Sequence, residues 1–537
     1  MKLNIDLSGR GGLATRFFGD MNGTSMPQSV YIAGESQIAD GIYNPLRYYG
    51  YLSPAVNAFT NITESDAGTD FTSEFSCSVT DLTTGDAFFG EADTGASMWL
   101  ETSSTDLTLT QGVDLDAIGG EFTDLEIYQI NGVKKLFYSY KATAAANADI
   151  GIADIPYTSG DIDWLSTLPT GKFDIGNHDI MMEVADNGYM YVGASNALHK
   201  IDGTTDGGAN GTVTPNAILF PYGWVIRDLC DEGGRLFIAI QSGEVVAGNT
   251  DSFESNISGI YMWDRQSTVL RMQNFIKLTG VKDIKKIYVS PSGAVRIHVI
   301  NSEKLFEIRE FTGSTFRIIQ QCGFESWGNY RDSLVNLGQL TVWYGRDGIL
   351  YSHGKISPND NEALYKMGDT LSLGSNFTTG ALSIYDASSS LRQAIRLSLE
   401  DSVNGILVKK WYPNGIGGID SVAQRQNAGN IYTPLKYLPQ MSTVNYIDVY
   451  CLTGTTSGTA TQANIKIYFN GSTTAWATKA VSLDDIKKGY KRIDIDKQYI
   501  NSMQLEIEYA TGTAVANATV FAPSFAAVDY TATNTKG

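Results

Sequence analysis

Acidic side chains in β-like segments are the residues of this chain best suited to chemistry. Glu183, Asp228 and Asp231 lie in apolar, alternating stretches that we expect to form inner strands of a sheet structure. Two carboxylates on either side of a glycosidic bond are the machinery of glycoside hydrolysis, so these three residues are the candidates for such a reaction. The alternative role for each is solvation at a turn or strand edge.

Other reactive groups do not form a recognisable motif. Asp114, Asp116 and Glu121 lie on a glycine-containing stretch that crudely resembles a calcium loop, but their spacing does not match an EF-hand. The four histidines and four cysteines have no metal-ligand or CxxC spacing, and the sequence has no nucleophile elbow or phosphate-binding loop. We therefore predict no catalytic residue, no cofactor and no metal site, and expect that the protein is not an enzyme.

The composition indicates the class of fold and excludes some kinds of binding partner. The 537 residues include 55 Gly, 29 Tyr and 22 Phe, which favours many short strands joined by tight turns. The formal charge of −19 gives no general attraction for nucleic acid or an anionic membrane. The N-terminus has no apolar stretch of secretory-signal length and no apolar run is long enough to span a bilayer, so we expect synthesis and folding in a cytoplasm.

A degenerate repeat organises residues 70–412. Each copy has two apolar strands joined by a Gly- or Asn-containing turn, followed by a third strand. Six copies are visible, with turns 45 to 59 residues apart, and residues 71–100 could supply another copy or a closing strand. Asn131-Gly132 and Asn187-Gly188 are the strongest hairpin signals, because a type I′ turn needs positive φ at both central residues. A period of this length predicts a β-propeller of about six blades, within a range of five to seven, although an irregular stack of β-sandwiches is the alternative.

Two further segments flank the repeat. Residues 413–537 alternate cleanly, for example in 503–509, and predict an antiparallel β-sandwich or jelly roll. Residues 1–69 form an N-terminal arm and lead-in, expected to lie on this protein's own surface or on a neighbouring subunit. The predicted assembly arm consists of Tyr43, Asn44, Pro45, Arg47, Tyr48, Tyr49, Tyr51 and Pro54.

Three aromatic residues of the C-terminal segment could offer stacking surfaces to a glycan. They are Trp476, Tyr446 and Tyr468. The alternative is that they are ordinary strand aromatics packed in the core of the predicted sandwich.

Together, the proline-containing arm, the degenerate blades and the terminal β-domain with its segment 488–495 resemble the virion β-propeller proteins of tailed bacteriophages, meaning tail hub, nozzle or adsorption components. The resemblance implies a structural homo-oligomeric ring in the virion, assembled in the host cytoplasm with other tail proteins, and carries over no catalytic residue. A carbohydrate-binding receptor-recognition module, which could bind a host-surface glycan, is the first alternative. A propeller-type glycoside hydrolase or lyase is the second.

Overall fold

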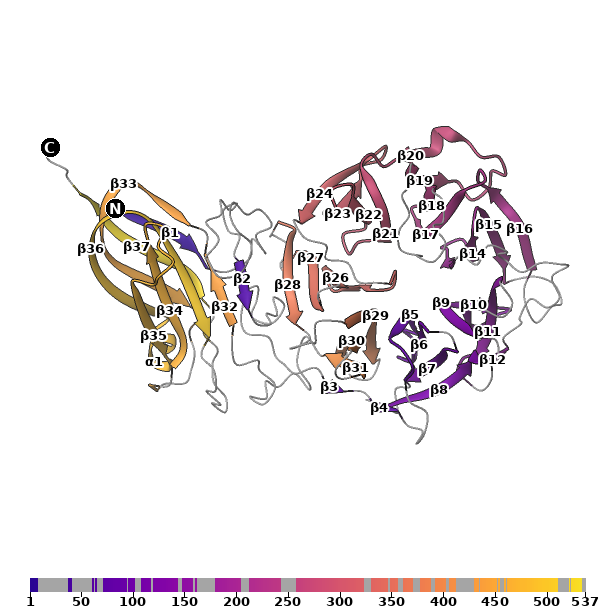
Figure 1. The fold of residues 1–537 in the computed structure, drawn as a ribbon, viewed down its shortest axis with the longest axis horizontal. Helices are drawn as coiled ribbons and strands as arrows, with labels where there is room; N and C mark the ends of the chain where they lie inside the picture. Colours follow the sequence, from indigo (N-terminus) through magenta and orange to yellow (C-terminus); the bar gives the residue numbers. More distant parts are fainter. Residues whose placement is uncertain are drawn as a thin grey trace. The chain divides into compact units, whose positions relative to one another are not determined.

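The computed structural model gives the protein as two compact units (Figure 1). One unit comprises Met1–Phe59, Ile349–Thr370 and Trp411–Gly537, and the other comprises Thr60–Gly348 and Leu371–Lys410. The structure describes the following residues, apart from one or two positions at a time inside these ranges: 1–7, 37–40, 60–64, 71–101, 108–142, 147–161, 179–203, 212–242, 257–322, 330–355, 361–369, 377–387, 392–401, 405–411, 429–453, 458–509 and 521–533.

Seven antiparallel sheets follow one another along the described part of residues 60–411. Their first strands are β5 (Phe75–Thr80), β9 (Gly120–Ile130), β13 (Ile180–Val184), β17 (Trp224–Glu232), β21 (Val281–Val289), β25 (Leu334–Leu337) and β29 (Phe377–Ala387). Their second strands are β6 (Ala87–Glu91), β10 (Val133–Ala142), β14 (Tyr189–Ala194), β18 (Arg235–Ser242), β22 (Val295–Asn301), β26 (Leu340–Tyr344) and β30 (Arg392–Asp401). The predicted all-β class is confirmed, and the repeat has a propeller-like order.

The remaining strands complete each sheet in chain order. Third strands are β7 (Ser97–Glu101), β11 (Asn147–Asp154), β15 (Ala197–Asp202), β19 (Ile257–Trp263), β23 (Phe306–Phe311), β27 (Ile349–Gly354) and β31 (Gly405–Trp411). Fourth strands are β8 (Thr108–Asp114), β12 (Gly160–Asp161), β16 (Thr212–Leu219), β20 (Phe275–Lys277), β24 (Phe316–Cys322) and β28 (Ala363–Asp369). The last sheet takes its fourth strand from the N-terminal side, because β3 (Thr60–Asn61) pairs with β31, while β4 (Thr63–Glu64) pairs with β8.

Hydrophobic clusters lie between neighbouring sheets, because a single four-stranded sheet cannot bury both of its faces. One cluster joins Ile180 and Met182 of β13 to Tyr128 of β9. Another joins the first sheet to the last one, with Trp99 of β7 in the same cluster as Val408 of β31. Residues 71–100, expected to add a blade or a closing strand, therefore contribute strands β5–β7 of a sheet of their own.

Both of the strongest hairpin signals correspond to hairpins in the structure, but their turns differ. Asn131 and Gly132 have φ values of 51° and 78°, so the type I′ turn predicted between β9 and β10 is confirmed. The hairpin predicted at the second site is confirmed, because β13 and β14 pair across it. Its turn is not of type I′, since of Asn187 and Gly188 only Gly188 has a positive φ, of 82°. The loop is longer than two residues: the Gly188 amide donates to the Ala185 carbonyl, which places Asn187 in an ordinary right-handed turn position.

The other unit contains one eight-stranded sheet, whose main order is β1-β37-β33-β36-β32-β2. These strands are β1 (Lys2–Asp6), β2 (Gln37–Asp40), β32 (Gly429–Tyr432), β33 (Lys436–Cys451), β36 (Tyr490–Tyr509) and β37 (Pro523–Ala532), with β34 (Thr461–Phe469) and β35 (Ala477–Ser482) beside β36. One core cluster takes side chains from six of them. A short helix, α1 (Leu483–Lys488), begins with a capping box between Ser482 and Asp485.

The N-terminal segment differs from the predicted arm. Lys2–Asp6 pairs with β37 in register from Lys2↔Asp529 to Asp6↔Phe525, so the chain begins as a strand of the terminal sheet. This segment forms a strand because its side chains alternate between the core and the solvent: Ile5 and Leu7 are buried, while Asn4 is exposed. The assembly-arm residues 41–54 lie outside the described residues.

Candidate functional site

First strands of the seven sheets carry carboxylates that accept hydrogen bonds from the first strand of the next sheet. A first strand pairs with its second strand on one side only, so the amide groups on its other edge need partners from elsewhere. The Asp124 carboxylate of β9 accepts the amide of Met182 on β13 at 2.6 Å, and the Asp228 carboxylate of β17 accepts the amide of Ile287 on β21 at 2.7 Å. These buried aspartates therefore join neighbouring sheets.

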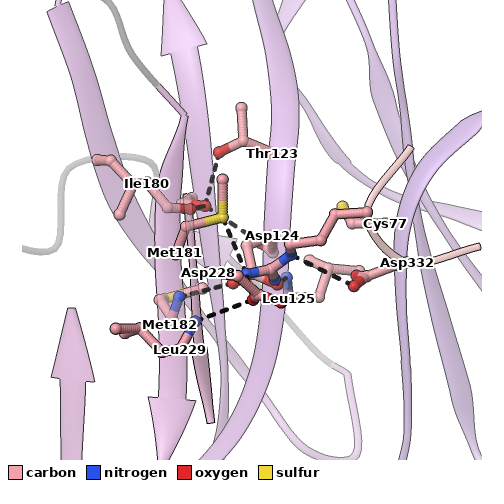
Figure 2. A network of polar contacts seen from close by, with 12 residues as sticks. Cys77, Thr123, Asp124, Leu125, Ile180, Met181, Met182, Asp228, Leu229 and Asp332 are labelled. Atoms are coloured by element: carbon pink, nitrogen blue, oxygen red, sulfur yellow. Dashed lines mark hydrogen bonds and ion pairs between the residues drawn. The ribbon is translucent and has the colours of Figure 1, made fainter. Parts of the chain in front are cut away.

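Arg331 lies at the centre of this arrangement. It belongs to the turn before β25, and its guanidinium reaches two aspartates that come from two other sheets. Its Nη2 atom is 2.5 Å from Asp124 Oδ1, and its Nη1 atom donates to Asp228 Oδ1 at 2.9 Å. Figure 2 shows Asp124, Asp228 and Asp332 converging at this point, with Met181 beside them. The side chain of Arg331 is 12% exposed, and those of Asp124 and Asp228 are 2% and 1% exposed.

A second cation completes the network. Lys286 of β21 donates to Asp332 Oδ1 at 3.0 Å. Burial disfavours the charge on Arg331, yet Asp124, Asp228 and Asp332 outweigh burial and raise its pKa well above the usual value. Burial also acts to raise the pKa of Asp332, but Lys286 and Arg331 more than offset it and lower that pKa. Two positive charges and three aspartates thus form one buried, mutually stabilised cluster.

Other acids nearby have raised pKa values. Burial raises the pKa of Asp124 to about 6, although Arg331 opposes the shift. Burial raises the pKa of Glu183 to about 8, and it raises the pKa of Glu126 well above its usual range, with repulsion from Glu183 adding to the effect. Glu183 accepts the amide of Asp231 at 3.0 Å. At neutral pH, Glu183 therefore holds its proton for most of the time, while Asp332 is ionised.

A cavity of about 310 Å³ adjoins the cluster. Every one of the seven sheets contributes a lining residue, including Ser78, Glu126, Glu183, Asp228, Lys286, Val335 and Ser383. A second cavity of about 610 Å³ is lined by residues nearer the beginning of the first strands, among them Glu121, Asp179, Arg227 and Asp283. Arg331 lines both cavities, so it is the residue that they share.

The second cavity carries its own paired charges. Lys141 is 2.8 Å from Glu121 and 2.6 Å from Asp179. Burial acts to raise the pKa of Asp179, but Lys141, together with Arg227 and Arg331, more than offsets it and lowers that pKa. Lys285 pairs with Asp283 at 2.8 Å. Four basic and four acidic side chains line this cavity, which leaves no formal excess of either charge.

The structure brings together two of the three carboxylates expected from sequence. Glu183 and Asp228 line the 310 Å³ cavity, whereas Asp231 is not among its lining residues. Asp231 instead pairs with Arg265 at 2.9 Å. Its placement follows from position along the strand, because Asp231 lies near the end of β17 and Asp228 lies at its middle.

The calcium-loop resemblance and metal motifs have no counterpart in the described residues. Asp114 accepts the amide of Asp116 at 2.7 Å, and Glu121 pairs with Lys141. Within the described part of the chain, no group of three His, Cys, Asp or Glu side chains is placed to hold a metal ion. No described helix is long and apolar enough to cross a membrane.

The three predicted glycan-stacking residues lie in the terminal unit with different exposures. Trp476 is 38% exposed and its ring centroid is 5.5 Å from that of Phe469. Tyr446 lies under the guanidinium of Arg492, 4.2 Å from its ring centroid. Tyr468 is only 7% exposed and its hydroxyl donates to Glu506, so its ring packs within the protein. A glycan role remains a prediction for Trp476 and Tyr446.

Sequence analysis missed the central residues of this site. Arg331 lies in a turn and meets Asp124 from 207 residues away, a distance over which no local pattern extends. One signal does exist: Asp124-Leu125 and Asp228-Leu229 occupy corresponding positions in two repeat copies, and each aspartate accepts the amide of the leucine that follows.

Comparison with solved structures finds proteins of similar fold at low sequence identity. Raptor from Chaetomium thermophilum is 10% identical with a TM-score of 0.39, over 66% of this chain and 29% of its own length. The Dos1 propeller is 12% identical with a TM-score of 0.40, over 67% of this chain and 95% of its own. An exo-β-1,3-galactanase from Phanerochaete chrysosporium is 9% identical with a TM-score of 0.29, over 89% of this chain and 100% of its own.

This chain therefore spans less than a third of the Raptor chain that it matches. No protein-family model and no curated protein matches the sequence. These TM-scores are too low to relate this chain to any of the three proteins.

Proposed function

We propose that this chain is a non-enzymatic structural component of a tailed-phage virion, a tail protein that assembles with other copies into a symmetric ring. The observation that carries the proposal is the Arg331 cluster. In a propeller-like enzyme the centre of the sheets is where substrate would meet free polar groups. Here the central guanidinium is bound by Asp124 and Asp228 from two different sheets, which favours a rigid building block.

The virion assignment itself is supported by the sequence resemblance. Proteomic analysis of purified particles from the source phage tests it directly. We expect peptides of this chain at a stoichiometry that fits a ring, and electron microscopy of the tail should contain matching density. Absence of the chain from washed particles would exclude the virion role while leaving the fold unaffected.

A finer proposal concerns the closure of the sheets. We infer that the seven sheets close into one propeller, with the last sheet against the first. The Phe75 amide donates to Ser398 Oγ at 2.8 Å, and Ser78 Oγ donates to the Leu382 carbonyl at 2.6 Å. These contacts join β5 to β29 and β30, which supports closure without a free edge.

A cysteine pair tests closure. Thr80 Oγ1 and Ser383 Oγ are 2.9 Å apart although 303 residues separate them in sequence. The double variant Thr80→Cys/Ser383→Cys should form a disulfide under mild oxidation, detected as a mobility shift on a non-reducing gel. Each single-cysteine variant is the control and should not shift. Two thiols that remain fully reactive in the folded double variant would contradict closure.

A glycoside hydrolase or lyase is the second candidate, favoured by one observation. Glu183, with its pKa raised to about 8, lies in the same cavity as Asp228, as a general acid and a second carboxylate would. It ranks second because both Asp228 oxygens are already engaged, by Arg331 and by the amides of Leu229 and Ile287. Release of reducing ends from a polysaccharide panel, lost in Asp228→Asn, would place this function first.

A further inference from the structure

The charged side chains that line the 610 Å³ cavity are already engaged with one another. Its four basic side chains each have a carboxylate oxygen at 2.5 to 3.9 Å; they are Lys141, Arg227, Lys285 and Arg331. The acid Glu74 accepts a hydrogen bond from the Tyr330 hydroxyl. A ligand with a formal charge would have to displace one of these pairs and leave a partner unbalanced, which is costly in a buried site.

The cavity lies where the seven sheets meet. Every sheet, or the turn that leads into it, contributes a lining residue, from Ser76 of β5 to Thr378 of β29. Glu121 and Asp179 are 34% and 40% exposed, so a ligand can reach the cavity from their end. The volume of about 610 Å³ falls within the ~300–1,000 Å³ that is typical of sites for small molecules.

The accessible lining of this cavity is polar. Its large apolar lining residues, Phe122, Met181 and Ile284, are only 1%, 5% and 2% exposed, so they offer little surface to a ligand. Sites for small molecules are usually lined mainly by hydrophobic side chains, and this one is not. The lining therefore favours a hydrophilic ligand over an apolar one.

Hydroxyl groups suit the paired side chains better than ions do. Lys141 carries three N–H donors, and its ion pairs with Glu121 and Asp179 use two of them. Each carboxylate has about four lone-pair sites, so both acids can accept further hydrogen bonds. Because a hydroxyl group both donates and accepts, it can bond to the lysine and to either acid without breaking an ion pair.

We propose that this cavity is a binding site for a neutral saccharide of one or two sugar residues, whose hydroxyl groups bond to two sets of paired side chains. One set is Glu121, Lys141 and Asp179, and the other is Asp283 and Lys285. The proposal goes beyond the structural role and does not depend on it. A sugar carries several closely spaced hydroxyl groups and no charge, which is the combination that this lining favours.

Two sources share this chemistry: a free sugar, or the terminal sugars of a glycan on a surface. Saturation-transfer NMR of the full-length chain with glucose, galactose, mannose, lactose, cellobiose and maltose tests for both. We expect saturable binding of at least one of the six, with the affinity then measured by calorimetry. Retention of the chain on a glycan array that presents the same sugar identifies a surface glycan, and binding in solution alone identifies a free sugar.

The charge argument has its own measurement. Glucuronate, galacturonate and mannuronate each differ from the corresponding hexose by a carboxylate in place of a hydroxymethyl group. Since an anion would have to compete with Glu121 or Asp179 for Lys141, the uronate should bind at least fivefold more weakly than its neutral hexose. A uronate that binds as tightly as the hexose, or more tightly, would contradict the proposal.

A triple variant removes one set of paired side chains. Glu121→Gln/Lys141→Met/Asp179→Asn leaves no member of the set charged, so it avoids an unbalanced charge. It should weaken sugar binding at least fivefold, because hydrogen bonds to charged groups are roughly twice as strong as those between neutral groups. A thermal melt of the variant confirms that it folds.

The terminal unit offers a matched control. Lys466 lies between Glu506 and Glu508 at 3.0 and 2.8 Å, and none of the three lines the cavity. Lys466→Met/Glu506→Gln/Glu508→Gln makes the same change in net charge and should leave the affinity unchanged.

A second variant blocks the cavity without altering a charge. Thr378→Trp adds a large side chain to the lining and should abolish sugar binding, whereas Thr478→Trp, at an exposed strand position outside the lining, should not. This comparison keeps the proposal falsifiable if the triple variant fails to fold. No saturable binding of any of the six sugars, or equal affinity in Thr378→Trp and Thr478→Trp, would overturn the proposal.

Discussion

Arg331 links side chains from several separate sheets. Its guanidinium satisfies Asp124 and Asp228, which in turn accept amides from β13 and β21. A buried ion pair need not stabilise a fold relative to apolar residues, but removing only one partner leaves a buried charge unbalanced. The loss of Arg331 should therefore cost far more than the loss of a surface arginine.

Replacing Arg331 with methionine should lower the free energy of unfolding by about 3–5 kcal/mol at pH 8. The loss should be smaller at pH 5, because protonation of Asp124 relieves the unbalanced charge; its pKa is already about 6 with Arg331 present. Arg317→Met is the control, since Arg317 is 65% exposed and its pair with Glu310 is worth no more than about 1 kcal/mol. Urea unfolding at both pH values measures the difference, and equal effects of the two substitutions would refute this role.

The raised pKa of Glu183 predicts that the stability of the folded protein depends on pH. Its pKa is about 8 in the folded protein against an ordinary value of 4.5, so the folded state binds this proton more tightly. The resulting stability is fully present below about pH 4.5 and is lost as the pH rises through 8. Glu183→Gln should therefore come close to the wild type near pH 5 and exceed its stability at pH 9, by up to about 4 kcal/mol at ~1.4 kcal/mol per unit of pKa shift.

Thermal and urea unfolding between pH 5 and 9 measure this divergence. Glu303→Gln, an exposed substitution, should show a constant difference from wild type across that range. Parallel stability curves for wild type and Glu183→Gln would show that the carboxyl group is solvated in the folded protein.

Individual strands were largely predictable, because alternation is a local property. Segment 503–509 was predicted as a strand and forms the end of β36, and the Asn131-Gly132 turn follows from the φ values that only such residues adopt easily. Long-range pairing was not predictable. Nothing in Lys2–Asp6 specifies β37 as its partner, and nothing near Arg331 specifies Asp124, because such contacts depend on tertiary packing.

The alternation in β1 makes a matched pair of substitutions possible. Ile5 is fully buried in the terminal core and the adjacent Asn4 is exposed. Ile5→Ala should destabilise this unit by about 2–4 kcal/mol, and Asn4→Ala should change its stability by less than about 0.5 kcal/mol. Hydrogen exchange followed by mass spectrometry should show faster exchange in β37 for Ile5→Ala only. Unchanged protection of β37 in Ile5→Ala would mean that β1 contributes little to the sheet.

At the scale of the whole molecule, net charge governs the association of copies. Each chain carries a formal charge of −19, so the proposed ring brings together subunits that repel one another. Screening shortens the range of this repulsion from about 10 Å at 0.1 M salt to about 3 Å at 1 M. Raising the NaCl concentration from 50 to 500 mM should therefore increase the assembled fraction in sedimentation velocity. Dissociation of assemblies at high salt would indicate that intersubunit ion pairs dominate instead.

The pairing of β1 with β37 has a consequence for biosynthesis. Ile5 leaves the ribosome long before its partner Ala526, which is made 521 residues later. At ~5–20 residues per second, the apolar N-terminal segment waits roughly half a minute to nearly two minutes for its place in the sheet. All strands of the seven sheets, including β31, which pairs with residues 60–61, have been synthesised before Ala526 is made. The nascent chain thus exposes an unpaired β-strand during most of translation, when a chaperone or another nascent copy has its best opportunity to bind it.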